Sequence, residues 1–362
     1  MKKNIFQISK YLNKTFKISH KQLYVITAKT FFTFYCSLFT FSSTAQDLHF
    51  SQFFNSPLST NPANTGFIPD ADYRLGAQYR NQYSNIMTSP YKTFSVFGDA
   101  QLLRDKIQNG WIGIGGLMLS DVAGSGTLRS TKIYASLAYH QMLGNSSLLS
   151  AGFNLGYANK RIDVSALKFP DQFDGHFFDS NLPTSVILNN TSISYFDMQA
   201  GVNYAFFPND NIYCNAGYSI HHVNKPKESF FDNQDANSMI PMRHIGFINA
   251  ILKLNSYVIL KPNVYYTNQA NASELTMGMI LNYNLSQKGE KQLIGGCYYR
   301  IKDAVIPMLG FQINQLIFNF SYDATISTLK AFNHYKGASE FSVIKNGFYG
   351  SKSDRQSLCP SF

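Results

Sequence analysis

The amino-acid sequence predicts an all-β fold, a transmembrane antiparallel β-barrel of about 14 strands that follows an irregular N-terminal segment. Composition and residue pattern both lead to this fold. Aromatic residues make up 15% of the 362 residues and charged residues only 14%, well below the ~25% of a typical soluble domain. Several segments also alternate strictly between apolar and small or polar residues, over the length that a tilted strand needs to cross a bilayer.

The alternation is clearest in residues 195–206, "YFDMQAGVNYAF". One parity carries large apolar side chains such as Phe196 and Val202, and the other carries small or polar ones such as Gln199 and Asn203. A soluble β-sandwich also alternates and stays the alternative fold, but its outer face is usually rich in Lys, Glu and Thr. The Gly, Asn, Ser and Gln of the second face suit a wet or crowded barrel lumen.

The same test predicts strands over fourteen ranges, which are 73–83, 91–102, 110–119, 131–141, 148–160, 195–206, 211–222, 243–254, 256–267, 273–285, 291–302, 305–313, 315–324 and 338–348. The long connections, 120–130, 161–194, 223–242 and 325–337, all follow odd-numbered strands. Bacterial barrels have short periplasmic turns and longer outer loops. We therefore expect the barrel to start in the periplasm and to carry every long loop outside.

Residues 1–45 have the features of a secretory signal peptide. They contain seven Lys and no acidic residue, followed by a Phe-rich run over 31–41 and by Ser43-Thr44-Ala45 as a cleavage site. The apolar run is too short for a membrane-spanning helix, which needs ~20 residues. We expect export to the outer membrane of a Gram-negative bacterium, with a signal peptide over 1–45, an N-terminal plug or periplasmic segment over 46–72 and a barrel over 73–362.

Removing this leader changes the charge balance of the chain. The whole sequence has 31 basic and 21 acidic residues, and without the seven Lys the balance is 24 to 21, or +3. The excess of positive charge therefore belongs mostly to the export signal, and we expect no nucleic-acid partner.

We expect no cofactor, metal or catalytic centre. Cys214, Cys297 and Cys359 remain after the leader, an odd number at unrelated spacings. The histidines are scattered, and no known catalytic motif is present. A barrel enzyme that acts on lipid would need a Ser and a His to meet at one bilayer depth. The Gly-rich run at 113–116 lies in a predicted strand, where glycine gives room for close packing or bending.

The N-terminal segment is shaped but irregular. Residues 47–66, "DLHFSQFFNSPLSTNPANTG", have no helical or strand period, and they contain two prolines and a closing glycine. The segment precedes the first strand, so it lies at the periplasmic mouth or folds into the lumen. Two interpretations stay open, a plug or docking face for periplasmic partners and a rigid lead-in that closes the bottom of the barrel.

Several motifs occur along the chain in a recognisable order. Near the N-terminus they are Gln46-Asp47, Phe50-Ser51-Gln52, Asn61-Pro62-Ala63 with Gly66, Arg80-Asn81-Gln82-Tyr83 and Pro90-Tyr91-Lys92-Thr93. Later ones are Gly295 to Ala304, Phe320 to Leu329, Gly337 to Val343 and Cys359 to Phe362. Together they resemble the PorP/SprF family of type IX secretion system outer-membrane proteins, with Tyr83 in place of the more usual Trp.

The resemblance implies an outer-membrane barrel that works with the type IX secretion machinery. It also implies one of two roles for such a protein. One is a component linked to the periplasmic secretion motor, and the other is a partner for one large surface adhesin, sometimes tied to gliding. We expect the outer loops to hold the C-terminal domain of a cargo, the N-terminal segment and short turns to face periplasmic partners, and the aromatic outward face to contact outer-membrane lipid. The alternative is a passive transporter for hydrophobic or small solutes.

Candidate structural or partner-binding residues come from these motifs and from charges near the predicted loops. They are Phe50, Ser51, Gln52, Asn61, Pro62, Ala63, Gly66, Arg80, Pro90, Lys92, Thr93, Arg300, Asp303, Tyr322, Asp323, Ser327 and Glu340. Charges in a low-dielectric lumen need partners. We hypothesise that Arg300, Asp323 and Glu340 pair inside the outer mouth and brace the loops, the alternative being a generic solvated rim.

Overall fold

The fold is taken from a computed structural model. It describes residues 48–69, 71–104, 106–124, 128–164, 167–179, 181–186, 190–230, 238–286 and 289–350. The predicted signal peptide, Gln46-Asp47 and the motif from Cys359 to Phe362 lie outside the described residues.

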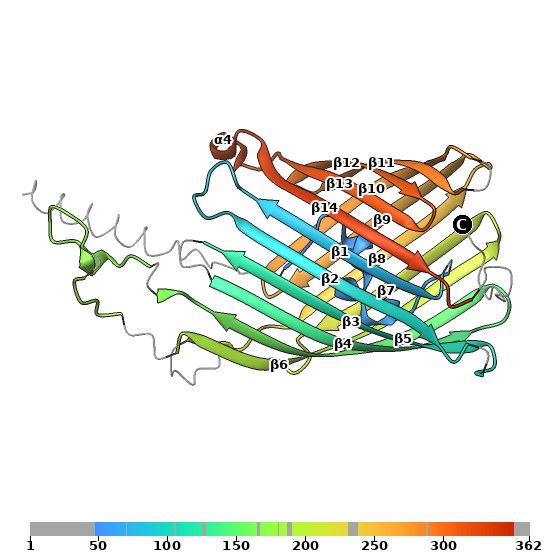
Figure 1. Cartoon of the computed structure of the whole chain (residues 1–362), viewed down its shortest axis with the longest axis horizontal. Helices are drawn as coiled ribbons and strands as arrows, with labels where there is room; N and C mark the ends of the chain where they lie inside the picture. The colour runs from blue at the N-terminus through green and yellow to red at the C-terminus, as the bar shows by residue number, and fades with distance from the viewer. Residues whose placement is uncertain are drawn as a thin grey trace, which may run out of the picture. The chain divides into compact units, whose positions relative to one another are not determined.

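Fourteen antiparallel strands close into a barrel, in which each strand pairs with its neighbours in the sequence and β1 pairs with β14 (Figure 1). The strands are β1 Tyr73–Gln82, β2 Tyr91–Leu102, β3 Gly110–Ala123, β4 Leu128–Met142, β5 Ser147–Arg161, β6 Ser192–Asn209, β7 Ile212–His221, β8 Arg243–Lys253, β9 Val258–Gln269, β10 Ala272–Asn284, β11 Lys291–Arg300, β12 Ala304–Ile313, β13 Leu316–Thr325 and β14 Lys336–Gly347. The predicted fold class is confirmed.

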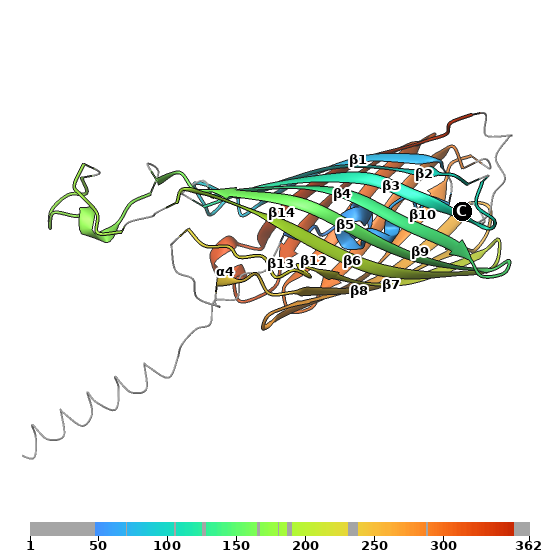
Figure 2. The same ribbon diagram turned by 90° about the horizontal axis from the view of Figure 1, so that it is seen from below.

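The two ends of the barrel differ in their connections. The end where β1 begins carries 103–109, 143–146, 210–211, 254–257, 285–290 and 314–315, and we call it the inner end. The opposite, outer end carries the long connections 162–191 and 222–242, together with the connection 326–335 that contains α4 Lys330–Asn333. The described part of the connection 162–191, which contains η4 Pro170–Gln172, extends beyond the strands in both side views (Figures 1 and 2).

The outer ends of β3 and β4 lie further out than alternation predicts. The predicted connection 120–130 is mostly strand, because β3 and β4 stay paired from Ser120↔Thr131 to Ala123↔Leu128 and only 124–127 connects them. The pattern misses this extension because a strand that continues past the bilayer has no apolar face to maintain. At the inner end, β6 runs through Pro208 to Asn209 and contains an irregularity there, which suits a residue without an N–H.

The strand faces divide as the alternation predicts. On β6 the side chain of Phe196 is 65% exposed on the outer surface, while Asp197, Gln199 and Asn203 are buried in the lumen. On β4 the outward residues Ile133 and Leu137 are exposed, and His140 is buried. The outer surface therefore presents an apolar face, as a barrel in lipid requires.

No helix in the described part of the chain is long and apolar enough to cross a membrane.

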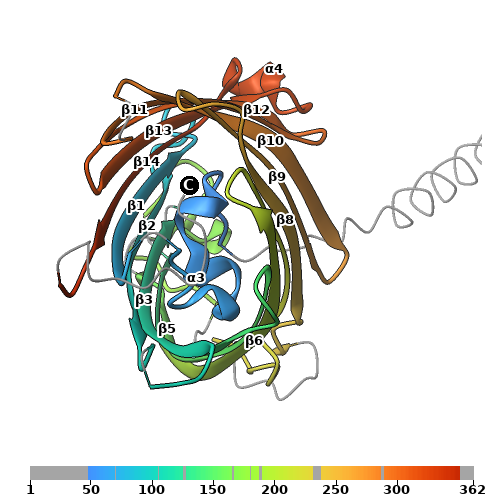
Figure 3. The same ribbon diagram turned by 90° about the vertical axis from the view of Figure 1, so that its right-hand side faces the viewer.

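The N-terminal segment lies inside the barrel (Figure 3), and the apolar core of the protein lies between this segment and the strands. The segment contains η1 Phe53–Asn55, α3 Pro57–Thr60 and η2 Pro62–Asn64. Each of three buried apolar clusters includes at least one of its side chains, namely Phe53, Phe67, and Phe50 with Leu58. The short helical turns let the chain follow the curved wall while prolines start α3 and η2.

We predict that Leu137→Arg on the outward face of β4 lowers the free energy of unfolding by ~2–4 kcal/mol, because a charge is placed in the hydrocarbon region. Leu143→Arg is the control, since Leu143 is exposed in an inner connection and its replacement is expected to cost at most ~1 kcal/mol. Urea titration of the protein refolded into lipid vesicles measures both. Equal losses would contradict this position of the bilayer.

Candidate functional site

Residues 48–69 and 71–72, which we call the lumenal segment, cross the inside of the barrel from its outer to its inner end. At the outer end, Arg243, the first residue of β8, donates from Nη1 to the Leu48 carbonyl (2.8 Å). At the inner end, Gln101 of β2 donates to the Ile68 carbonyl (2.8 Å), and Asp72 leads into β1. The segment thus occupies the lumen, and its first described residues lie far from the inner mouth.

Ser51 lies at the centre of a buried charged network. Its hydroxyl accepts hydrogen bonds from Arg80 Nη1 (2.5 Å) and Arg300 Nη2 (2.6 Å), and it donates to the Asp323 carboxylate (2.8 Å). Arg80 and Arg300 also form ion pairs with Asp323, at 2.8 and 3.1 Å. One hydroxyl therefore joins β1, β11 and β13 to the lumenal segment.

Glu340 holds the backbone of the same turn. Its carboxylate accepts the backbone N–H groups of Ser51 and Gln52, each at 2.8 Å, and it pairs with Arg80 Nη1 at 3.1 Å. Gln78 of β1 donates to it as well (3.1 Å). We call Ser51, Gln52, Arg80, Arg300, Asp323 and Glu340 the latch.

The latch spans the line along which the barrel closes. Arg80 of β1 lies directly opposite Glu340 of β14 in the strand register, so the two side chains join the first and last strands across the lumen surface. All four charged side chains are almost completely buried. Buried charges of this kind stabilise a fold only when their hydrogen bonds are satisfied, and here the lumenal segment supplies the missing donors and the shared hydroxyl.

Asn61-Pro62-Ala63 packs against glycines of the wall. The Asn61 side-chain amide donates to the carbonyl of Val202 on β6 (2.9 Å), and its oxygen accepts the N–H of Ala63 (2.9 Å), which starts η2. A Cβ on Gly201 would lie 2.0 Å from Asn61 Oδ1, and one on Gly152 would lie 2.4 Å from the Pro62 carbonyl carbon. The wall therefore needs glycine at both positions.

The inner end of the segment is held by Gly66. Its φ is +69°, a conformation that glycine adopts without strain. Its N–H donates to Asp99 Oδ2 (2.8 Å), and its carbonyl accepts from Trp111 Nε1 (2.9 Å). A Cβ on Gly113 would lie 1.9 Å from the Thr65 carbonyl oxygen. The predicted role of the 113–116 glycines in close packing is thus seen at Gly113.

The structure separates the other candidate residues. Arg300 pairs with Asp323, as hypothesised, and also with Asp303 (3.0 Å). Glu340 pairs with Arg80 rather than with Arg300. The remaining candidates lie outside the latch. Phe50 lies in a buried apolar cluster, Pro90 in the first outer loop, and Lys92 is exposed at the start of β2. The Thr93 hydroxyl donates to Asp121, Tyr322 lies on the outward face of β13, and the Ser327 N–H donates to the Asp303 carbonyl.

Sequence reasoning missed several residues that bind the segment, including Gln78, Asp99, Gly152, Gly201 and Arg243. Asp99 could have been found, because it is a charged residue on the lumen-facing parity of the predicted strand 91–102. The glycines of β5 and β6 could not be distinguished from other small residues of the lumen face.

A second buried polar group lies on another part of the wall. His222 Nδ1 is 2.8 Å from Asp197 Oδ1, and the Tyr134 hydroxyl donates to Asp197 Oδ2 (2.6 Å). The group joins β4, β6 and the residue that follows β7. The contact with Asp197 gives the buried His222 side chain a structural role.

The two long outer connections are joined to one another. Glu228 of the second forms an ion pair with Lys160 and accepts from the Tyr195 hydroxyl (3.0 Å), so it bridges both strands that carry the first. The N–H of Asn190 also donates to the Phe230 carbonyl (3.3 Å). These contacts support a folded platform above the outer end of β5 and β6.

The projecting part of the first connection, residues 167–186 without the undescribed residue 180, is held by its own carboxylates. Hydrogen bonds from the Ser185 N–H and hydroxyl lower the pKa of Asp171, and those from the N–H groups of Phe177 and His176 lower the pKa of Asp174. Both carboxylates therefore stay charged and bonded at neutral pH. In the same part of the chain Phe173 is 55% exposed and Phe177 is 77% exposed. We therefore call residues 167–179 and 181–186 the aromatic tip.

Comparison with known proteins gives one family and one fold. The family model described as type IX secretion system membrane protein PorP/SprF matches residues 42–344. No curated protein matches the chain.

Among solved structures, the Ralstonia pickettii toluene transporter TbuX is similar with a TM-score of 0.50 and 10% identity, covering 81% of this chain and 94% of its own. The Pseudomonas putida toluene transporter TodX is similar with a TM-score of 0.47 and 12% identity, covering 82% and 95%. At 10% identity, the similarity to TbuX supports the barrel fold alone.

We predict that Arg80→Met lowers the free energy of unfolding by ~3–5 kcal/mol, because it removes the ion pair of the buried Glu340 carboxylate and one of the two ion pairs of Asp323. Lys92→Met removes a positive charge from the same hairpin at an exposed position, and we expect a change within ~0.5 kcal/mol. Denaturant titration in detergent measures both. Similar losses in the two variants would show that the latch adds nothing beyond general charge.

We predict that Gly113→Ala displaces the inner part of the lumenal segment, because the added methyl group meets backbone atoms of Thr65 and Gly66. The expected cost is ~1–3 kcal/mol, as for other overpacked sites. The segment should also become accessible to protease in the folded barrel. Gly116→Ala, on the outward face of the same strand and with ordinary contacts only, is the control and should stay resistant.

Proposed function

The chain belongs to the PorP/SprF family of type IX secretion system membrane proteins, and we propose that it holds a secreted cargo protein at the cell surface through its outer loops. Family and fold together are those of an outer-membrane secretion barrel, and this family is not a class of enzymes. Membership implies contact with secretion components and with cargo in general. The proposal adds that the cargo contact is made by the aromatic tip and that the cargo is an adhesin-like protein with a C-terminal docking domain.

The single observation that carries the proposal is the combination of a filled lumen and a projecting platform. The lumenal segment is tied to the wall at its outer end by the latch and at its inner end by Gly66. A solute that crosses the barrel would have to displace these contacts. This favours a protein that acts by binding other proteins over the alternative of a passive transporter.

The outer end supplies a surface suited to such binding. Phe173 and Phe177 of the aromatic tip are largely exposed, as are Phe332 and Tyr335 in the connection between β13 and β14. Exposed aromatic side chains on a structured loop are typical anchors of protein interfaces. The hydrogen bonds of Asp171 and Asp174 hold the tip in shape before a partner binds, which lowers the entropy cost of association.

The inner end is proposed to meet the periplasmic secretion motor. Several of its connections, such as 143–146, 254–257 and 314–315, are short. A barrel that binds cargo outside and the motor inside would link the two sides of the membrane, and it would also serve gliding if the cargo were a motility adhesin.

We predict that the double variant Phe173→Ser, Phe177→Ser loses its cargo. In a mild-detergent pull-down of the tagged protein from outer membranes, read by mass spectrometry, a large secreted protein should co-elute with the unchanged protein and fall at least tenfold with the variant. Loss of two central aromatic anchors costs ≥2 kcal/mol at typical interfaces.

The matched control is Ile86→Ser, which removes an exposed apolar side chain from the outer loop between β1 and β2. It should retain the cargo. Recovery of only periplasmic components with the unchanged protein would overturn cargo binding, and equal recovery with the tip variant would place the contact elsewhere. Saturable solute conductance by the pure protein would favour the transporter.

A further inference from the structure

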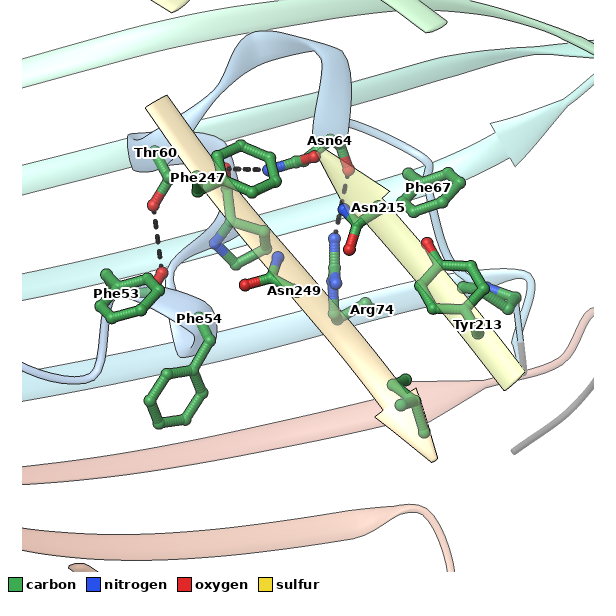
Figure 4. Close-up of a pocket in the computed structure, with 13 residues that line it drawn as sticks. Phe53, Phe54, Thr60, Asn64, Phe67, Arg74, Tyr213, Asn215, Phe247 and Asn249 are labelled. Atoms are coloured by element: carbon green, nitrogen blue, oxygen red, sulfur yellow. Dashed lines mark hydrogen bonds between the residues drawn. The ribbon is translucent and has the colours of Figure 1, made fainter. Parts of the chain in front are cut away.

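A cavity lies beside the lumenal segment in the inner half of the barrel (Figure 4). Its volume is about 170 Å³, and it is bounded by the segment on one side and by β1, β7 and β8 on the other. It reaches the inner end of the strands, because Arg74 and Tyr213 are the second residues of β1 and β7. Neither the latch nor the aromatic tip contributes to it.

Five aromatic rings contribute to the wall of the cavity. Phe53, Phe54 and Phe67 come from the lumenal segment, and Tyr213 and Phe247 come from β7 and β8. Figure 4 shows these rings on several sides of the space rather than stacked in one group. An apolar protein cavity of ~150 Å³ holds one benzene-sized molecule, so this volume suits a single aromatic ring.

One polar atom in the lining has no partner. The side-chain oxygen of Asn249 is buried, and within the described part of the chain it accepts no hydrogen bond. A buried acceptor without a donor is costly and calls for an explanation. A ligand that donates one hydrogen bond would satisfy it.

The charge of the lining is neutralised. Arg74 borders the cavity, but its Nε and Nη2 donate to the two carboxylate oxygens of Asp99, at 3.0 and 2.7 Å. An anion would have to compete with this bidentate pair, and a cation would meet the guanidinium. The lining thus favours an uncharged molecule.

We propose that this cavity binds a small, uncharged aromatic molecule with one hydrogen-bond donor, of the phenol class, with the ring among Phe53, Phe67 and Phe247 and the donor on Asn249 Oδ1. Such a ligand reaches the site from the periplasmic side without crossing the latch. It rests between the segment and the wall and so stabilises the filled state of the lumen.

The test uses the full-length protein in detergent and phenol as the probe, measured by titration calorimetry. Trp111, the single tryptophan of the chain, gives a second readout, because it packs in one buried cluster with Phe67 and Tyr213 of the lining. We expect saturable phenol binding with a change in tryptophan emission, and no saturable binding of benzoate.

Two variants locate the site. Ile251→Phe fills the inner edge of the cavity and should abolish binding, whereas Ile248→Phe changes the exposed outer face of the same strand and should preserve it. Asn249→Leu should weaken phenol about tenfold, the effect of one hydrogen bond, and leave anisole, which has no donor, unchanged. Heat-modifiable migration on gels confirms that each variant is folded.

Three results would overturn the proposal. They are absence of saturable phenol binding to the unchanged protein, equal binding by Ile251→Phe and Ile248→Phe, and an equal loss of phenol and anisole in Asn249→Leu. Cargo is absent from this experiment, so its outcome is independent of the outer-loop function.

Discussion

The structure depends on one buried arrangement, in which the hydroxyl of Ser51 and the N–H groups of Ser51 and Gln52 satisfy the charges of Arg80, Arg300, Asp323 and Glu340. Without the lumenal segment, this part of the wall would hold two arginines and two carboxylates in a low-dielectric lumen with incomplete hydrogen bonding. With it, the charges join strands that are distant in the sequence. Since Arg80 and Glu340 lie on the first and last strands, the latch also links filling of the lumen to closure of the barrel.

The inner part of the segment is held by close packing against the wall and by the hydrogen bonds of Gly66 with Asp99 and Trp111. Glycines on β3, β5 and β6 let the backbone from Asn61 to Gly66 approach the wall more closely than any other residue would allow. This explains why the segment is irregular. Its short turns follow the positions of these glycines, and a continuous helix would be too wide to touch them all. The aromatic cavity lies on the side of the segment that faces β7 and β8.

The two ends of the molecule consequently have different physical properties. The outer end carries large loops that are stabilised by their own hydrogen bonds and expose aromatic rings. The inner end has short connections and a small aromatic space that opens beside the start of β1. Between them the lumen is occupied. Binding events at the two ends can therefore influence each other only through the segment or through the strands, which gives the lumenal segment a central position in any coupling across the membrane.

The sequence by itself determined the barrel, because alternation with period two is a local property that each strand carries alone. It also identified the residues of the latch, through the motifs around Phe50-Ser51-Gln52 and the charges near the predicted loops. Only the tertiary structure decided which of them meet. Arg80 and Lys92 look alike in one predicted hairpin, yet one side chain is buried in the latch and the other is exposed. Ser51 meets Asp323 and Glu340 across more than two hundred residues, and that contact exists only after the barrel closes around the segment. The direction of the segment through the lumen has the same origin, since it follows from the positions of glycines and charges on different strands, which no local pattern relates to one another.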